Sequence, residues 1–131
     1  MSSPLPFKRV LLKLSGEILM GEQAFGIQQS ACLQVARCLF EAKQKGLQIS
    51  VVIGGGNIFR GLDLKARGVA RTPADHMGML ATMLNGLALQ QALVALGAEA
   101  CVMSALDCPK VVESYNWQRA MHHVEGDKLL I

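Results

Sequence analysis

The hydrophobic positions of this chain fall into short apolar runs that alternate with longer segments of helical spacing. The short runs, bounded by glycine, proline or polar residues, predict four strands, at 10–14, 48–53, 99–104 and 128–131. Apolar residues at helical spacing predict three helices, over 29–45, 75–96 and 113–124. The run at 48–53 is apolar at nearly every position, so we expect this strand to be buried on both faces.

The regular alternation of strand and helix predicts a parallel sheet with helices on both faces, which is an α/β fold. At 131 residues the chain has room for one domain. The last predicted strand has only four residues before the chain stops, which we interpret as an interrupted fold. In a parallel sheet of this kind, ligands bind beyond the carboxyl ends of the strands, so we expect the functional residues there.

The predicted helix at 75–96 is unusual because no Asp, Glu, Lys or Arg occurs from 76 to 98, a length sufficient to span a bilayer. Small or polar residues nevertheless recur on one side at helical spacing: Gly78, Thr82, Asn85 and Gly86. Thr72 is expected to cap this helix, with Pro73 at its first position and Asp75 in its first turn. We expect a core helix that also faces a partner subunit, and not a membrane span.

Composition excludes several classes of protein. Hydrophobic residues make up 51% of the chain and charged residues 18%, which is the balance of a folded domain. The net charge is +3 and aromatic residues make up 5%, so a nucleic-acid surface is not expected. The four cysteines have no C-x-x-C spacing, and the N-terminus lacks the pattern of a signal peptide. We therefore expect no metal site, reduced thiols and a cytoplasmic protein.

Two features fall at the carboxyl ends of predicted strands. The first is Lys13, a lysine in an otherwise apolar strand, which is followed by Ser15 and Gly16. Burial of the ammonium group requires a partner, and a bound phosphate would supply one. For an isolated lysine, however, the more common arrangement is one in which the side chain reaches water.

The second feature is the run of three glycines at 54–56, followed by Asn57. Glycines allow the backbone to approach a ligand closely and to aim successive N–H groups at an anion. A plain tight turn needs fewer glycines, so we favour the anion-binding interpretation. The dinucleotide fingerprint does not fit, because Phe59 stands where it needs glycine, and the P-loop does not fit, because Ile27 and Gln28 replace its Lys and Ser or Thr.

Several titratable side chains lie close to these features in the sequence. Arg60 follows the glycines and would clamp phosphate oxygens. Asp75 would accept hydrogen bonds from ribose hydroxyls, although a role at the start of its helix explains it equally well. His76 is expected in the first turn of a helix, and His122 and His123 on the surface of a late helix, all without a catalytic role. Two phosphate-type loops with cations beside them suit phosphoryl transfer.

Three segments carry a specific resemblance to a known family: KLSGE at 13–17, VIGGGNIFRG at 52–61, and ADHMGMLAT at 74–82 with Asn-Gly at 85–86. The first two are typical of the amino-acid kinase superfamily, and the third is much more particular to one branch of it. From about residue 8 to its end, the chain resembles the bacterial uridylate kinases (UMP kinases), which are unrelated to the P-loop nucleoside monophosphate kinases.

The resemblance implies a three-layer αβα sandwich with a mainly parallel sheet, the carbamate kinase-like fold. It implies transfer of the γ-phosphoryl group of ATP to UMP, giving UDP and ADP, with Mg²⁺ accompanying ATP. It also implies a cytoplasmic homohexamer of pyrimidine nucleotide biosynthesis, regulated by GTP or UTP, with the long helix after Asp75 at a subunit contact. No contact with nucleic acid or with a membrane is expected.

Roles for individual residues follow from the matched motifs alone. Lys13 and Arg60 would be catalytic, stabilising and clamping the transferring phosphoryl group. The residues expected to bind ATP are Lys13, Leu14, Ser15, Gly16, Gly56 and Arg60. Those expected to bind UMP are Gly55, beside the phosphate, and Asp75, at the ribose. The segment that resembles the family's GTP-linked region comprises Gly21, Glu22, Gln23, Ala24, Phe25 and Gly26.

The family chain is nearly twice as long as this one. Its second glycine-rich loop, which holds the UMP phosphate, has no counterpart here, nor does the half that binds the base of ATP and supplies a catalytic aspartate. We therefore expect residues 1–131 to be the N-terminal, mainly UMP-side portion of an amino-acid kinase domain, inactive by itself. Two alternatives stay open: another superfamily kinase that acts on a carboxylate or carbamate, and a non-catalytic nucleotide-sensing or assembly fragment.

Overall fold

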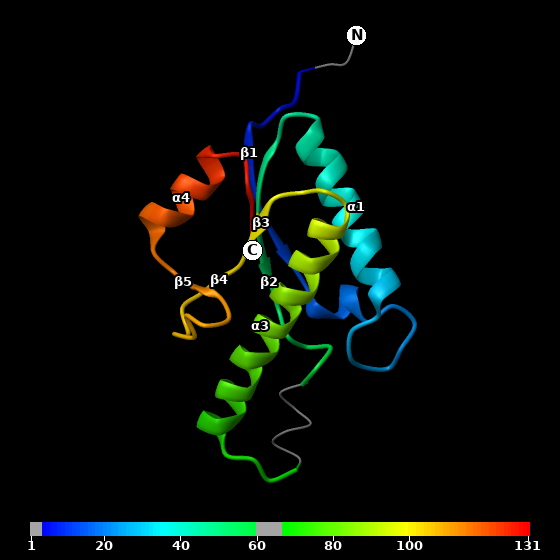
Figure 1. The fold of residues 1–131 in the computed structure, drawn as a ribbon. Helices are drawn as coiled ribbons and strands as arrows, with labels where there is room; N and C mark the ends of the chain where they lie inside the picture. The colour runs from blue at the N-terminus through cyan, green and yellow to red at the C-terminus, as the bar shows by residue number, and fades with distance from the viewer. Residues whose placement is uncertain (1–3, 60–66) are drawn as a thin grey trace.

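The computed structural model describes residues 4–59 and 67–131. Figure 1 shows a central set of strands, seen nearly edge-on, between helix α4 (Trp117–Glu125) and helix α1 (Gln29–Gln44). The longest helix, α3 (Arg71–Ala95), runs beside α1. The expected α/β architecture, with helices on both faces of a parallel sheet, is confirmed.

The main sheet has four parallel strands in the order β1 (Arg9–Leu14), β2 (Gln48–Ile53), β6 (Leu129–Leu130) and β3 (Ala100–Cys101). β1 and β2 pair along their whole length, from Arg9 opposite Gln48 to Leu14 opposite Ile53. The strand predicted at 128–131 is confirmed as β6, which pairs with β2 on one side and with β3 on the other. The two longest strands therefore end together at one edge of the sheet.

The connection from β1 to β2 agrees with its prediction. Helix α1 ends one residue before the predicted boundary and buries Cys32, Ala36 and Leu39 in the main core. The chain turns at Gly46, whose φ of 102° is a left-handed conformation that glycine adopts without strain.

Strand β2 has its predicted bounds, but it is buried on one face only. Ile49, Val51 and Ile53 point into the main core, whereas Val52 is 52% exposed on the opposite face, next to Leu11 of β1 at 69%. Helix α4 covers only part of that face, and a groove of about 740 Å³ remains beside it, lined mostly by apolar side chains. The expectation of burial on both faces is therefore wrong.

The run at 99–104 forms two strands and not the single strand predicted. Strand β3 belongs to the main sheet, whereas β4 (Met103–Ser104) pairs in parallel with β5 (Glu113–Ser114) in a separate two-stranded sheet. The break falls at Val102, whose carbonyl oxygen accepts a hydrogen bond from the Glu113 N–H at 3.1 Å. A partner strand from a later segment, which the local pattern does not specify, thus divides the run.

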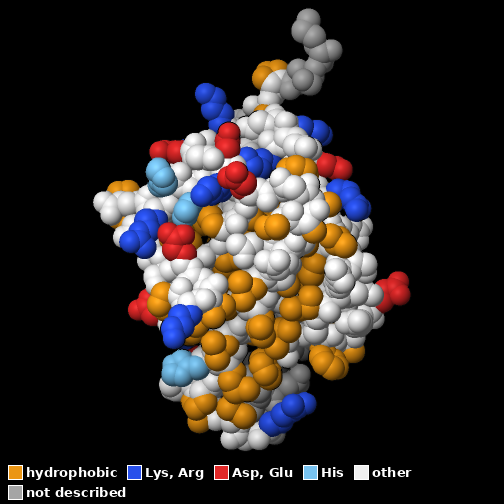
Figure 2. Space-filling model, viewed as in Figure 1, with side chains coloured by type: hydrophobic (Ala, Val, Ile, Leu, Met, Phe, Trp, Pro, Cys, Tyr) orange, Lys and Arg blue, Asp and Glu red, His pale blue; other side chains and the backbone are white. Residues whose placement is uncertain are grey.

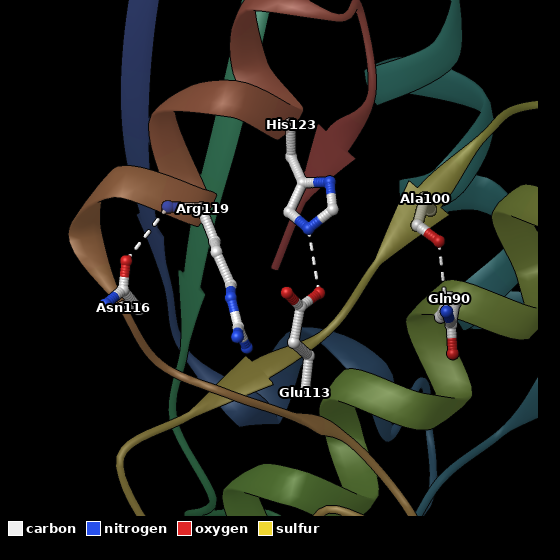
Figure 3. A network of polar contacts seen from close by, with 6 residues as sticks. All are labelled: Gln90, Ala100, Glu113, Asn116, Arg119 and His123. Atoms are coloured by element: carbon white, nitrogen blue, oxygen red, sulfur yellow. Dashed lines mark hydrogen bonds and ion pairs between the residues drawn. The ribbon is translucent and has the colours of Figure 1, made fainter.

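The helix predicted at 113–124 begins later than expected, because its first two residues form β5. Asn116 caps the observed helix α4: its Oδ1 accepts a hydrogen bond from the Arg119 N–H at 3.1 Å (Figure 3). Asparagine is a favourable residue at this position because its side chain satisfies an N–H group that has no partner inside the helix. The cap sets the start of α4 at Trp117.

Helix α3 begins earlier than predicted, at Arg71, with Ala70 as its N-cap and no side-chain cap. Thr72 and Pro73 are the second and third residues of the helix. The expected roles of Thr72 as the cap and of Pro73 as the first helical residue are therefore wrong. Proline is tolerated there because N–H groups of the first turn have no partner inside the helix.

Helix α3 is long and apolar enough to cross a membrane by length and composition, as the sequence indicated. One face, which includes the fully buried Leu89 and Leu93, belongs to the main core together with residues of α1 and the sheet, as expected. The other face is uncovered: Leu80, Leu84 and Val94 are between 50% and 52% exposed. Figure 2 shows apolar side chains gathered along the path of this helix.

The small residues of α3 mark places where other segments come close. A Cβ atom on Gly55, in the loop after β2, would lie 2.9 Å from the Cβ of Ala81 and 3.2 Å from the carbonyl oxygen of Gly78. A Cβ atom on Gly86 would lie 3.1 Å from a methyl carbon of Val102. The small residues thus allow the glycine loop and the residue between β3 and β4 to pack directly on α3.

We expect Gly55→Ala to lower the free energy of unfolding by about 1–3 kcal/mol, the usual effect of forcing a methyl group into filled space. Gly56→Ala is the matched control, because the nearest atom to its Cβ would be Oε1 of Glu17, at the ordinary contact distance of 3.9 Å. Urea unfolding of both variants measures the difference. Equal losses for the two variants would contradict the close packing at Gly55.

Candidate functional site

The segments that follow β1 and β2 meet at one edge of the sheet. The N–H group of Gly54 donates a hydrogen bond to the carbonyl oxygen of Leu14 at 3.0 Å. Gly16 is buried, and a Cβ atom there would lie 2.6 Å from the carbonyl oxygen of Gly54. The two loops that the sequence singled out are therefore in direct contact.

The first loop begins with a short 3-10 helix, η1 (Gly16–Leu19). Ser15 is the N-cap of η1, and its Oγ accepts a hydrogen bond from the Glu17 N–H at 3.3 Å. Leu19 is fully buried and anchors the turn in the main core. The Ser15 hydroxyl therefore helps to shape the loop.

The second loop turns sharply beyond β2. The N–H groups of Ile58 and Phe59 both donate to the carbonyl oxygen of Gly55, at 3.0 and 3.2 Å. Gly55 lies against α3, whereas the nearest atom to a Cβ on Gly56 would be Oε1 of Glu17 at 3.9 Å, among the described residues other than its chain neighbours. One side of the loop is thus fixed by packing, and at Gly56 the described residues leave the backbone open to close approach.

Lys13, at the end of β1, is exposed. It lies opposite Val52 in the register, and both residues belong to the sheet face that carries the apolar groove. Within residues 4–59 and 67–131 it forms no ion pair. Its ammonium group is therefore accessible at the edge where the two loops meet.

Asp75 lies beyond the first turn of α3, and its side chain is 68% exposed. One carboxylate oxygen lies 3.9 Å from Nε of Arg71, and an exposed pair of this kind contributes little to stability. Because Ala70 occupies the N-cap, the explanation of Asp75 as a residue of the helix start is wrong. His76 is exposed as well, and its expected place in the first turn is wrong, because it is the sixth residue of the helix.

Arg60 lies outside the described residues, so its role as a phosphate clamp stays a prediction from the sequence.

The segment at 21–26 is attached to the glycine loop. The Gly26 N–H donates to the carbonyl oxygen of Asn57 at 2.6 Å, and the Gln28 N–H donates to that of Leu19 at 2.8 Å. Phe25, near the tip of the segment, is 74% exposed. The structure therefore brings this segment, the first loop and the glycine loop together at one edge of the sheet.

The most deeply buried polar contact of the site is not predicted by the sequence pattern. Asn57 is 1% exposed and Asn85 is fully buried, and their side chains form hydrogen bonds with each other. The available signal was an asparagine in the middle of an apolar helix, since a buried amide needs partners. The sequence placed Asn85 in the stripe of α3 without indicating what it contacts.

A second polar contact joins α4 to β5, where Nε2 of His123 lies 2.8 Å from Oε2 of Glu113 (Figure 3). The His123 side chain is only 15% exposed, so the expectation of a surface position is wrong for His123, whereas His122 is exposed.

Burial, with a smaller contribution from the charge of Glu113, raises the pKa of the Cys101 thiol to about 11. Cys101 is therefore a protonated thiol near neutral pH and is poorly suited to act as a nucleophile.

The chemistry available at the site is that of anion binding. In the part of the chain that the structure describes, no group of three or more His, Cys, Asp or Glu side chains is placed to hold a metal ion. The two loops instead offer backbone N–H groups, and Lys13 adds a positive charge beside them. Successive backbone N–H groups and a nearby cation are suited to phosphate.

Comparison with known proteins agrees with this geometry. The chain is 62% identical over 124 residues to a uridylate kinase of Protochlamydia amoebophila (strain UWE25), a match that covers 95% of this chain and 49% of the relative. It is 47% identical over 131 residues to a uridylate kinase of Bartonella bacilliformis, a match that covers 100% of this chain and 55% of the relative. The chain thus spans about half the length of the curated relatives that it matches.

The fold has close structural counterparts as well. The crystal structure of UMP kinase from Bacillus anthracis superimposes with a TM-score of 0.91 at 35% identity, over 97% of this chain and 52% of that one. The expected αβα architecture is confirmed by this similarity. The sequence pattern of the amino acid kinase family matches residues 8–131, which is nearly the whole chain. On these grounds, the protein belongs to the amino acid kinase family.

Proposed function

We propose that this chain forms the UMP side of a kinase that transfers the γ-phosphoryl group of ATP to UMP, giving UDP and ADP. The observation that carries the proposal is the direct contact between the loops at 14–17 and 54–57, in a chain 62% identical to a uridylate kinase over 124 residues. Both loops lie at the carboxyl edge of a parallel sheet, where substrates bind in folds of this kind.

Phosphoryl transfer requires little covalent chemistry from a protein, since positioning and charge neutralisation supply most of the catalysis. In our proposal, Lys13 and Arg60 stabilise and clamp the phosphoryl group as it moves. Residues 14–16 and Gly56 line the ATP phosphates, and Gly55 lies beside the phosphate of UMP. The exposed ammonium group of Lys13, directly before the first loop, supports this assignment.

We assign Asp75 to the UMP ribose, whose hydroxyl groups would donate hydrogen bonds to its carboxylate. Three observations support the assignment. The side chain is 68% exposed, and no capping role at the helix start accounts for it. Asp75 also lies three residues before Gly78, which contacts the glycine loop at Gly55.

Magnesium enters the proposal only as the ion that accompanies ATP. Mg²⁺ in kinases is usually held by one or two carboxylates together with substrate phosphates. Among the described residues, no group of three or more His, Cys, Asp or Glu side chains is placed to hold the ion.

The proposal extends to assembly, location and regulation. The uncovered apolar face of α3 supports a subunit contact, which we place in a cytoplasmic homohexamer that contributes to pyrimidine nucleotide synthesis. We assign the segment at 21–26 to the response to GTP, and UTP is a further candidate effector of the whole protein. The segment's hydrogen bond to Asn57 would connect the response to the glycine loop.

Titration calorimetry tests the proposal against its alternatives. UMP is compared with aspartate, glutamate and carbamate as ligands of an extended chain, defined as this chain joined after Ile131 to the matching second half of the Protochlamydia relative. Binding of UMP with turnover supports the proposal. Binding of a carboxylate or carbamate in place of UMP, or of UMP without turnover, would favour the other superfamily kinase or the sensing fragment, respectively.

We expect the 131-residue chain by itself to show no measurable UMP kinase activity. It spans about half the length of its relatives, and phosphoryl transfer depends on holding both nucleotides in line, so an incomplete site loses most of the catalysis. The measurement is UDP production from ATP and UMP, with the extended chain as positive control. Turnover near about one per second, within the ordinary range for enzymes, would contradict the expectation.

In the extended chain, Lys13→Ala should lower turnover by about a hundredfold or more, while the KM for UMP changes little. The reason is that one lost contact to the developing charge has an effect of this size. Lys45→Ala is the matched control, since Lys45 precedes β2 and thus lies at the opposite edge of the sheet. A Lys13 variant with near-normal turnover and weakened UMP binding would assign Lys13 to binding alone.

Asp75→Asn in the extended chain should weaken UMP binding about tenfold or more and leave ATP binding nearly unchanged, because an amide accepts the ribose hydrogen bonds less strongly than a carboxylate does. Its melting temperature should stay the same, because the side chain is exposed and caps no helix. Arg71→Ala is the control, since it removes the 3.9 Å pair but keeps the carboxylate. If both variants weaken UMP equally, the ion pair and not the ribose contact is responsible.

A further inference from the structure

Two asparagine side chains form a closed pair beneath the glycine loop. Nδ2 of Asn85 donates to Oδ1 of Asn57 at 2.7 Å, and Nδ2 of Asn57 donates to Oδ1 of Asn85 at 3.0 Å. They are the two buried polar side chains in the described part of the chain. One comes from the loop after β2 and the other from the middle of α3, so the pair joins two separate segments.

The second N–H of each amide is also used, and each binds a backbone carbonyl group. Asn85 Nδ2 donates to the oxygen of Gly54 at 2.7 Å, and Asn57 Nδ2 donates to that of Gly26 at 2.9 Å. The two bonds fix the orientation of both amides, because a rotated amide would place its oxygen against a carbonyl oxygen. All four N–H bonds of the pair are therefore directed at defined acceptors.

The pair contacts three segments: the glycine loop, the segment at 21–26 and the first loop. Asn57 binds Gly26 twice, through its side chain and through its carbonyl oxygen, which accepts the Gly26 N–H at 2.6 Å. Gly16 of the first loop packs on the pair, since a Cβ atom there would lie 2.8 Å from Nδ2 of Asn85. An apolar pair of similar size would fill the same space, but it would not select which carbonyl groups are held.

The carbonyl group of Gly54 has a direct consequence for the proposed phosphate site. A peptide unit is planar, so the direction of the Gly54 carbonyl group sets the direction of the N–H group of Gly55 on the opposite side. Asn85 holds the Gly54 oxygen at 2.7 Å and therefore determines where the Gly55 N–H points. Gly55 is the residue that we assign to the UMP phosphate.

We propose that Asn57 and Asn85 are positioning residues, which orient the Gly55 N–H for phosphate and attach the segment at 21–26 to the glycine loop. The inference rests on the proposed function only in naming the ligand of Gly55. A buried amide that loses its partner is costly, so the pair favours a single arrangement of the loops before any ligand arrives.

The test compares Asn85→Asp with Gln90→Ala in this chain by amide NMR. Aspartate has the same shape as asparagine but has no N–H to donate to the Gly54 oxygen. Gln90 lies on the same helix, and its Nε2 donates to the carbonyl oxygen of Ala100 at 3.0 Å, away from the glycine loop (Figure 3). Its replacement therefore removes a comparable hydrogen bond without touching the pair.

Asn85→Asp should shift the Gly55 amide resonance more than any amide of α4 and speed hydrogen exchange at the Gly26 N–H about tenfold or more. Gln90→Ala should do neither. An unshifted Gly55 resonance in folded Asn85→Asp, or equal shifts in the two variants, would overturn the inference.

A measurement on the unaltered chain covers the case in which Asn85→Asp does not fold. The side-chain NH₂ protons of Asn57 and Asn85 should exchange with solvent at least about tenfold more slowly than those of the exposed Asn116. Equal rates would overturn the inference.

The experiments distinguish a failure of the positioning role from a failure of the proposed function. If the extended chain phosphorylates no UMP, the proposed function fails, while the Gly55 shift still decides the role of the pair. If it is active, Asn85→Asp should lower turnover by a larger factor than Gln90→Ala does, and equal turnover in the two variants would overturn the positioning role.

Discussion

The parallel pairing of β1 with β2 is the constraint on which the rest of this structure depends. The register runs without a break from Arg9 opposite Gln48 to Leu14 opposite Ile53, so the chain must leave both strands at the same edge. A parallel pair cannot be joined by a tight turn, and the crossover through α1 supplies both the connection and one side of the core. The proximity of the two loops is therefore a consequence of strand direction.

The close approach of the two loops buries backbone N–H and C=O groups, and each of these groups needs a hydrogen-bond partner. Glycine makes the approach sterically possible. A side chain at Gly16 would collide with the glycine loop, and one at Gly55 would collide with α3. The asparagine pair supplies hydrogen-bond partners, since its N–H groups bind the carbonyl oxygens of Gly26 and Gly54. The glycines leave space for the close approach, and the asparagines fix the orientation of the backbone carbonyl groups.

The parts of the structure that the sequence predicts well are those set by local pattern. Strand β2 has its predicted bounds, and α1 ends within one residue of its prediction, because apolar spacing and a terminal glycine specify them. The contact between the two loops also follows from sequence, through the rule that parallel strands end at the same edge.

The parts that the sequence does not predict depend on distant partners. Whether 99–104 is one strand or two is decided at Val102 by a hydrogen bond to Glu113, and the burial of Val52 depends on what covers the second face of the sheet. The role of Asn85 requires knowledge that Asn57 lies beside it, although 28 positions separate them. Local pattern identifies a buried asparagine as unusual, but only the tertiary fold identifies its partner.

At the edge of the sheet where the loops meet, the buried polar side chains are neutral and the charged ones are exposed. The buried members, Asn57 and Asn85, are neutral, whereas Lys13 and Asp75 are exposed. The physical reason is that removing an ion from water costs several kcal/mol, while a buried amide recovers most of its cost through hydrogen bonds. Neutral dipoles can therefore hold the loops in place in the absence of ligand, and the charges stay in water.

This division has a consequence for binding. At the phosphate site that we propose, a ligand would find N–H groups already oriented, so little of the binding free energy would be used to order the loops. The exposed charges would lose their hydration only when phosphate replaced the water, and their interaction with it would strengthen as water left. Buried neutral groups that hold the loops, with exposed charges beside them, would therefore suit a phosphate site at this edge of the sheet.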